Sequence, residues 1–109
     1  MPKKRKQKAR VVSIEPAVLE ALADPEVAAV YIRDCLKETG PSRSRLLLRA
    51  LMNVARAQGI SSLAGGSESR RRLIYKALSD NGNPSITTIE SILNAMGLAI
   101  DVRPLKKAG

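Results

Sequence analysis

The chain has 109 residues, of which 44% are hydrophobic, so it is long enough to build the core of one domain. It contains a single cysteine, Cys35, and no histidine, which excludes an internal disulfide, a Cys- or His-based metal site and His-based acid–base catalysis within the chain. Lys and Arg outnumber Asp and Glu by 19 to 10, and the net charge of +9 predicts a polyanionic partner, either nucleic acid or an anionic membrane surface.

Much of the positive charge lies at the start of the chain. Six basic side chains fall within the first ten residues, and without them 13 basic side chains remain against 10 acidic ones. No apolar segment follows this run, and no apolar stretch approaches the roughly 18 residues of a membrane span. We therefore expect a cytoplasmic chain, with residues 1–23 as a basic, flexible arm that is either solvated or in contact with a DNA backbone. Within it, residues 18–22 could form a helical turn or pack onto a partner.

The first two predicted helices have clear boundaries. Asp24, Pro25 and Glu26 supply an N-cap, a first-turn proline and a first-turn acid, and Gly40-Pro41 ends the helix. Its apolar face consists of Ala28, Tyr31, Ile32, Cys35 and Leu36. A second helix begins after Ser42 or Ser44 and stops at Gly59, and its buried face consists of Leu47, Ala50, Leu51, Val54 and Ala55.

The third and fourth predicted helices are short and lie close together in the sequence. The third spans residues 60–64 and is ended by two glycines, and the fourth runs from about residue 69 to residue 79. The inner face of the fourth helix consists of Ile74, Ala77 and Leu78. Two short helices that cross at a sharp turn, the second with polar residues near its N-terminus, are typical of a helix-turn-helix.

The end of the chain predicts a fifth helix and one strand. After a turn at residues 81–84, Thr87 and Glu90 form a capping box, and Gly97 closes the helix. Alternate residues are then apolar up to Pro104, which predicts a strand whose apolar side consists of Leu98, Ile100 and Val102. A lone strand leaves its backbone groups unpaired, so we expect these three residues to form a homodimer interface or to meet the sheet edge of a partner.

The predicted fold is therefore all-α, with five helices and one short C-terminal β-strand. The folded domain spans residues 24–104, and residues 105–109 form a tail. Arginines on the fourth helix suit DNA, because the guanidinium group pairs bidentately with guanine O6 and N7. The predicted DNA-binding residues are Ser69, Arg70, Arg71, Arg72, Tyr75, Lys76 and Asn83. The simpler interpretation of the arginine cluster is a solvated basic face.

The sequence also resembles a known family. The similar segments are Leu63-Ala64, the run from Leu73 to Ser79, Gly82-Asn83-Pro84 and the run from Leu93 to Leu98. Together they resemble the HigA-like addiction module antidote antitoxins, which are bacterial, lambda-repressor-like (Xre-type) helix-turn-helix proteins. The resemblance extends over about residues 24–102. It implies binding to the module's own promoter and neutralisation of a RelE/HigB-type toxin. We expect no cofactor, and a homodimer would double the contacts on a palindromic operator.

The chain departs from this family at the turn. The family places glycine four residues after the Leu-Ala pair, where this chain has Glu68, whereas Gly65 and Gly66 come earlier. A glutamate with a positive φ is uncommon, and glycine adopts that conformation freely. Either Glu68 is strained, or the turn is rebuilt around the two glycines, with Ser67 or Ser69 as the N-cap of the fourth helix.

Three functional classes compete. The leading hypothesis is a DNA-binding antitoxin that represses its own promoter. The second is a helix-turn-helix protein-interaction module, or a transcriptional regulator without a toxin partner. The third is a small basic ribonuclease, but such enzymes generally use a multi-stranded sheet as the active-site platform and this sequence predicts one strand. We therefore expect a non-enzymatic protein.

Overall fold

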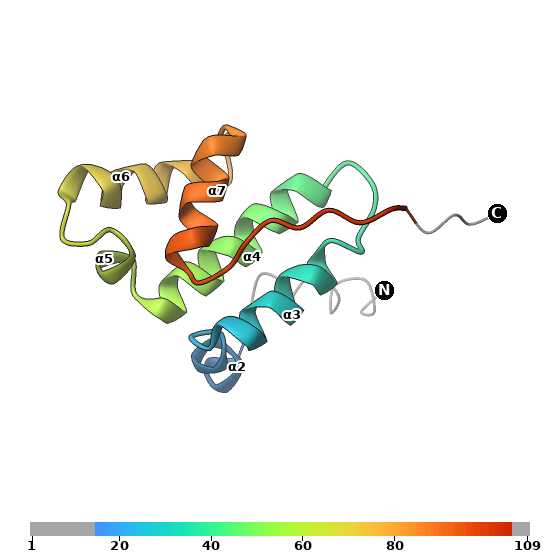
Figure 1. Cartoon of the computed structure of the whole chain (residues 1–109), viewed down its shortest axis with the longest axis horizontal. Helices are drawn as coiled ribbons and strands as arrows, with labels where there is room; N and C mark the ends of the chain where they lie inside the picture. Colours follow the sequence, from blue (N-terminus) through green and yellow to red (C-terminus); the bar gives the residue numbers. More distant parts are fainter. Residues whose placement is uncertain (1–14, 106–109) are drawn as a thin grey trace.

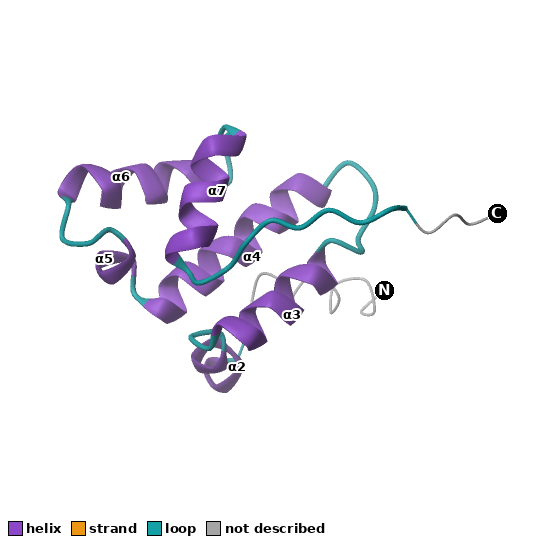
Figure 2. Cartoon of the chain, in the orientation of Figure 1, coloured by secondary structure: helices purple, strands orange, loops and turns teal. Residues whose placement is uncertain are grey.

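The computed structural model describes residues 15–105 of the chain. Over this range all regular structure is helical, and the predicted all-α class agrees with it (Figure 2). Residues 1–14, which carry the basic cluster of the predicted arm, and residues 106–109 of the predicted tail lie outside the described residues. The helices between residues 15 and 105 are α2 (Pro16–Ala21), α3 (Pro25–Cys35), α4 (Arg43–Gln58), α5 (Ile60–Leu63), α6 (Glu68–Ala77) and α7 (Ile86–Ala95).

Helix α4 is the central element of the fold. Helices α2 and α3 lie on one side of it, and α5, α6 and α7 lie on the other (Figure 1). The core between them is aliphatic, as expected for a chain without Phe or Trp. Its largest fully buried side chains are Leu22, Leu51, Val54, Ile74, Leu78, Ile92 and Met96. No helix in the described part of the chain is both long and apolar enough to cross a membrane.

The start of α3 follows the predicted pattern. The Asp24 side chain accepts a hydrogen bond of 2.9 Å from the Glu26 N–H, and Pro25 occupies the first turn. The helix ends at Cys35, however, and not at Gly40. The Arg43 guanidinium donates two hydrogen bonds to the Leu36 carbonyl, at 3.3 and 3.1 Å. A side chain from α4 thus provides the donor for a carbonyl group at the C-terminal end of α3. A local sequence pattern does not show such a tertiary contact.

The predicted buried face of α3 is largely confirmed. Ala28, Ile32 and Cys35 are buried, and burial raises the pKa of the Cys35 thiol, with smaller contributions from nearby acids. Tyr31 is half-buried, and its hydroxyl accepts a hydrogen bond of 3.0 Å from the Asn53 amide on α4. Burial also raises the pKa of Tyr31. Leu36, predicted on the same face, is 38% exposed and lies just after the last helical residue.

Helix α2 lies within the segment expected to be a flexible arm. It has only six residues and begins at Pro16, which is suited to a first helical turn. Leu22, just after its end, is 1% exposed and belongs to the core, and α2 packs against α4. Of the two alternatives for residues 18–22, the structure therefore contains the helical turn.

Two predictions near the C-terminus are wrong. Helix α7 is not capped by Thr87: the Ser85 hydroxyl accepts from the Thr88 N–H at 3.1 Å, and the helix begins at Ile86. The predicted strand over residues 98–103 does not form, and this segment has no regular structure. A strand requires a neighbouring strand for its backbone hydrogen bonds, and residues 15–105 provide none. Gly97 does close α7, with a φ of 87°.

Candidate nucleic-acid interface

The turn between α5 and α6 is built on two glycines. Gly65 and Gly66 have φ angles of 62° and 82°, and no other residue of this turn has a positive φ. A Cβ atom at either glycine would contact nothing within 4 Å, so the requirement for glycine is conformational and not steric. Glu68 has an ordinary helical backbone. The turn is therefore rebuilt around Gly65 and Gly66, the second of the two alternatives that the sequence left open.

Helix α6 begins one residue before the predicted start. Ser67 is the N-cap, and its hydroxyl accepts a 3.2 Å hydrogen bond from the Arg70 N–H. Ser69, the other candidate cap, lies in the first turn, where its hydroxyl is 3.2 Å from that of Ser67. The helix ends at Ala77 and not at Ser79, whose hydroxyl donates to the Lys76 carbonyl at 2.9 Å.

The inner face of α6 is as predicted. Ile74, Ala77 and Leu78 are 1%, 6% and 2% exposed and fix the helix on the core. Because Ile74 and Ala77 are turned inward, the residues on the opposite side of the helix face solvent. The exposed residues of α6 are Glu68, Ser69, Arg72, Leu73, Tyr75 and Lys76.

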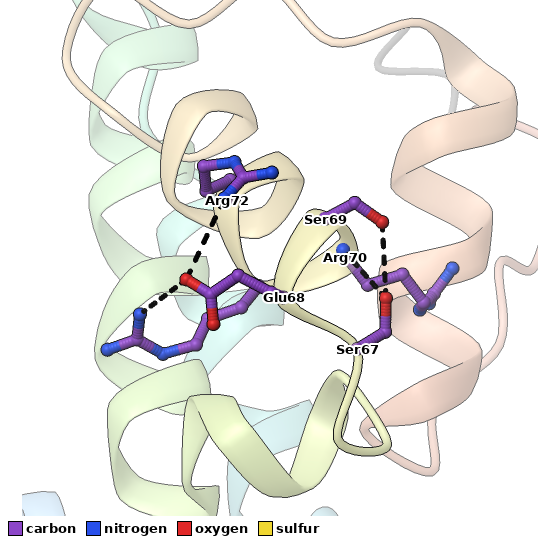
Figure 3. Close-up of polar contacts among 6 residues, drawn as sticks. Ser67, Glu68, Ser69, Arg70 and Arg72 are labelled. Carbon is purple, nitrogen blue, oxygen red and sulfur yellow. Dashed lines mark hydrogen bonds and ion pairs between the residues drawn. The ribbon is translucent and has the colours of Figure 1, made fainter.

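Arg70 is set apart from the other predicted DNA-binding residues. Its guanidinium group donates to the Ser91 hydroxyl of α7 at 3.3 Å, and the residue is half-buried. Figure 3 shows its side chain extending toward α7, whereas Glu68 lies on the other side of α6. The spacing gives the reason, because Arg70 precedes the buried Ile74 by four residues and therefore lies on the inner side of the helix.

A chain of contacts runs along the exposed side of α6. The Glu68 carboxylate lies 3.6 Å from a guanidinium nitrogen of Arg71 and 3.8 Å from one of Arg72 (Figure 3). The Arg71 guanidinium in turn lies 5.3 Å from the centre of the Tyr75 ring, a cation–π distance. We define Glu68, Arg71, Arg72, Tyr75 and Lys76 as the α6 stripe. From the sequence, Glu68 was predicted only as a residue of the turn, although its spacing of three and four from Arg71 and Arg72 indicates these contacts.

The turn after α6 is tied to α4. The Arg49 guanidinium donates to both carboxylate oxygens of Asp80, at 3.0 and 3.2 Å. This pairing lowers the pKa of Asp80 and raises that of Arg49. Asn83, a predicted DNA-binding residue, is exposed in the same turn. The bidentate pair therefore holds the C-terminal end of α6 and the exposed turn against α4.

The predicted dimer residues lie away from the α6 stripe, on the extended segment after α7 (Figure 1). Leu98 is half-buried and packs on the core, whereas Ile100 and Val102 are 46% and 85% exposed. The structure thus separates the predicted site residues into the α6 stripe, the Arg70 contact with α7, and an exposed apolar segment at the end of the described chain.

Comparison with known proteins assigns the chain to a family. Residues 15–104 match the family described as "Probable addiction module antidote protein". The chain belongs to this family. Membership of the antidote family supports an antitoxin role for this chain. It also suggests that the protein is regulatory and non-enzymatic, and it implies that a toxin is its partner. Membership also agrees with the antidote resemblance seen in the sequence.

One relative of this antidote-family chain is a protein of Haemophilus influenzae whose name is "Uncharacterized protein". The two are 34% identical over 86 residues, which cover 79% of this chain and 86% of the relative. No solved structure matches the chain.

Proposed function

We propose that this antidote-family protein is an antitoxin that binds operator DNA through α6, represses its own promoter and neutralises a RelE/HigB-type toxin. Helices α5 and α6 would act as the helix-turn-helix, with α6 in the major groove. The observation that carries the DNA-binding part is the α6 stripe. It presents exposed Arg, Tyr and Lys side chains on a helix whose opposite face is fixed in the core.

The geometry gives the candidate residues different roles. Arg72 and Lys76 are exposed on the outer side of α6 and can meet base edges or phosphates. Arg71 and Tyr75 are stacked beside them, and Ser69 and Asn83 flank the two ends of the helix. Arg70 is a positioning residue in this proposal, because its hydrogen bond to Ser91 aligns α6 with α7.

A gel shift with a duplex from the protein's own upstream promoter tests the DNA-binding part. We expect Arg72→Ala to weaken binding to this duplex by about 1–3 kcal/mol, or roughly 5- to 150-fold, and to weaken binding to an unrelated duplex less. Arg33→Ala is the matched control, because Arg33 is an exposed arginine on α3, across α4 from α6. Equal effects of the two substitutions would show that only net charge matters and that α6 does not read the operator.

Co-expression tests the antitoxin part. The toxin encoded beside this protein should arrest growth when expressed alone, and co-expression of the wild-type chain should restore growth. Persistent arrest with both proteins present at comparable levels would contradict the assignment of this toxin as the partner. The two tests are independent, so a DNA-binding regulator without a toxin partner would pass the first and fail the second.

A further inference from the structure

Glu68 occupies a central place on the exposed side of α6. It is the first residue of the helix, and it precedes Arg71 by three residues and Arg72 by four, so all three share one face. Recognition helices contact base edges mainly with residues near their N-terminus. If α6 enters the major groove as proposed above, Glu68 enters with it.

The fold alone gives little reason for an acid at this position. The Glu68 side chain is 67% exposed, and its distances of 3.6 and 3.8 Å to the two arginines are long for ion pairs. Exposed pairs of this kind contribute little to stability. An acid in a first helical turn interacts favourably with the helix dipole, but a carboxylate among phosphates is repelled unless it gains a hydrogen bond. The arginines on either side reduce this repulsion.

The hydrogen-bonding chemistry of a carboxylate restricts which base it can meet. An ionised glutamate only accepts hydrogen bonds. In the major groove, guanine and thymine offer acceptors at O6, N7 and O4, whereas cytosine offers the N4 amino donor. Adenine offers its N6 amino group next to the N7 acceptor, which repels a second carboxylate oxygen. Cytosine is therefore the base that suits Glu68 best.

We infer that Glu68 is a specificity-determining residue, which accepts a hydrogen bond from cytosine N4 at one position of each operator half-site. Arg71 and Arg72, which lie beside its carboxylate in the free protein, offset its charge near the phosphates. This inference rests on the proposed DNA-binding function, and the experiment distinguishes the failure of one from the failure of the other.

The test is selection of bound duplexes from a pool randomised over about 20 base pairs, the length of two adjacent half-sites. The full chain is used as wild type, Glu68→Gln and Glu68→Ala. A glutamine amide both donates and accepts, and pairs bidentately with adenine N6 and N7. We expect a cytosine in each wild-type half-site, an adenine at the same position with Glu68→Gln, and no preference there with Glu68→Ala. On matched duplexes the ratio of affinities for cytosine and adenine should change about tenfold or more.

The control is Glu26→Gln, which removes the first-turn acid of α3 and the same charge on the other side of α4. It should leave the selected sequence unchanged. If both Glu68 variants bind every duplex more tightly and keep the sequence preference of the wild type, the charge of Glu68 only weakens DNA binding in general. That result would overturn the inference. If the wild-type chain selects no sequence at all, the proposed DNA-binding function fails, and this inference fails with it. Circular dichroism and thermal unfolding of each variant check that the helical content and the stability of the fold are unchanged.

Discussion

Gly82 shows how one small residue fixes the end of the proposed recognition helix. A Cβ atom at this position would collide with the carbonyl oxygen of Ala77 and lie 3.0 Å from that of Lys76. The Gly82 N–H donates to the Ser79 carbonyl at 2.9 Å, which holds the turn tightly against the end of α6. The need for glycine here is steric, unlike at Gly65 and Gly66, because backbone atoms block the space that a side chain would fill.

We predict that Gly82→Ala destabilises the fold by about 1–3 kcal/mol, the usual cost of forcing an extra methyl group into filled space. Thermal unfolding followed by circular dichroism measures this as a lower melting temperature. Asn81→Ala is the control, because Asn81 is exposed and next to Gly82 in the chain. If the Gly82→Ala variant has the same melting temperature as the wild type, the turn can move away from α6 and the prediction is wrong.

At the scale of the elements, the link between Arg49 and Asp80 connects α4 to the turn after α6. Both carboxylate oxygens of Asp80 accept from the guanidinium group, so its pKa lies below the ordinary value of 3.8. In the unfolded chain this pairing is lost and the ordinary value returns. A carboxyl group with a lowered pKa in the folded state stabilises that state above its unfolded pKa, and this contribution disappears as the pH falls through the folded value.

Asp80→Asn should therefore lower the melting temperature slightly at pH 7 and have a smaller effect below pH 3.8 as the wild-type carboxyl group becomes protonated. The effect is small because the Asp80 side chain is 59% exposed. Melting curves of both proteins between neutral and acidic pH measure the difference. Asp34→Asn is the control, since its pair with Lys37 is 3.9 Å long and involves two exposed side chains. A difference in melting temperature that grows on acidification would contradict the expected sign.

The sequence predicted the elements whose signals are local. Asp24 and Pro25 define the start of α3, Gly59 and Gly97 close α4 and α7, and the apolar spacing of α6 identifies its inner face. Each of these signals lies within a few residues of the sequence, so it can be recognised without knowing the tertiary structure.

Two of the features that the sequence did not predict depend on contacts between separate elements. The end of α3 is set by Arg43, and α2 is held by packing on α4. The contacts of Glu68 depend on which of two turn conformations forms, and both fitted the sequence. The period-two pattern after Gly97 describes side chains that alternate, but a strand also needs a second strand beside it, and residues 15–105 contain none. The basic and aromatic members of the α6 stripe were thus predicted, whereas Glu68 and the contacts within the stripe were not.

At the scale of the whole molecule, the segment from Leu98 to Leu105 is the most exposed apolar part of the described chain. Ile100, Val102 and Leu105 are 46%, 85% and 91% exposed, and the segment lacks regular structure. The Val102 N–H is occupied by the Asp101 side chain at 2.9 Å, and Pro104 has no N–H to donate. A second copy aligned antiparallel could supply the missing backbone partners as far as Pro104 and cover the apolar side chains.

We predict that the protein forms a homodimer through this segment, with Leu98, Ile100 and Val102 at the interface, and that each subunit then meets one half-site of a palindromic operator. Sedimentation equilibrium at tens of micromolar, roughly the range of weak association, should give the mass of a dimer. Val102→Lys should weaken the dimer by about 100-fold or more, because each dimer loses two buried valines and burying one is worth about 1.5–3 kcal/mol. Ala99→Lys is the control, because Ala99 alternates with Leu98 and Ile100 along this extended segment and would face away from the paired apolar side chains. A monomeric wild-type protein would rule out this interface, and so would equal weakening by the two lysine substitutions.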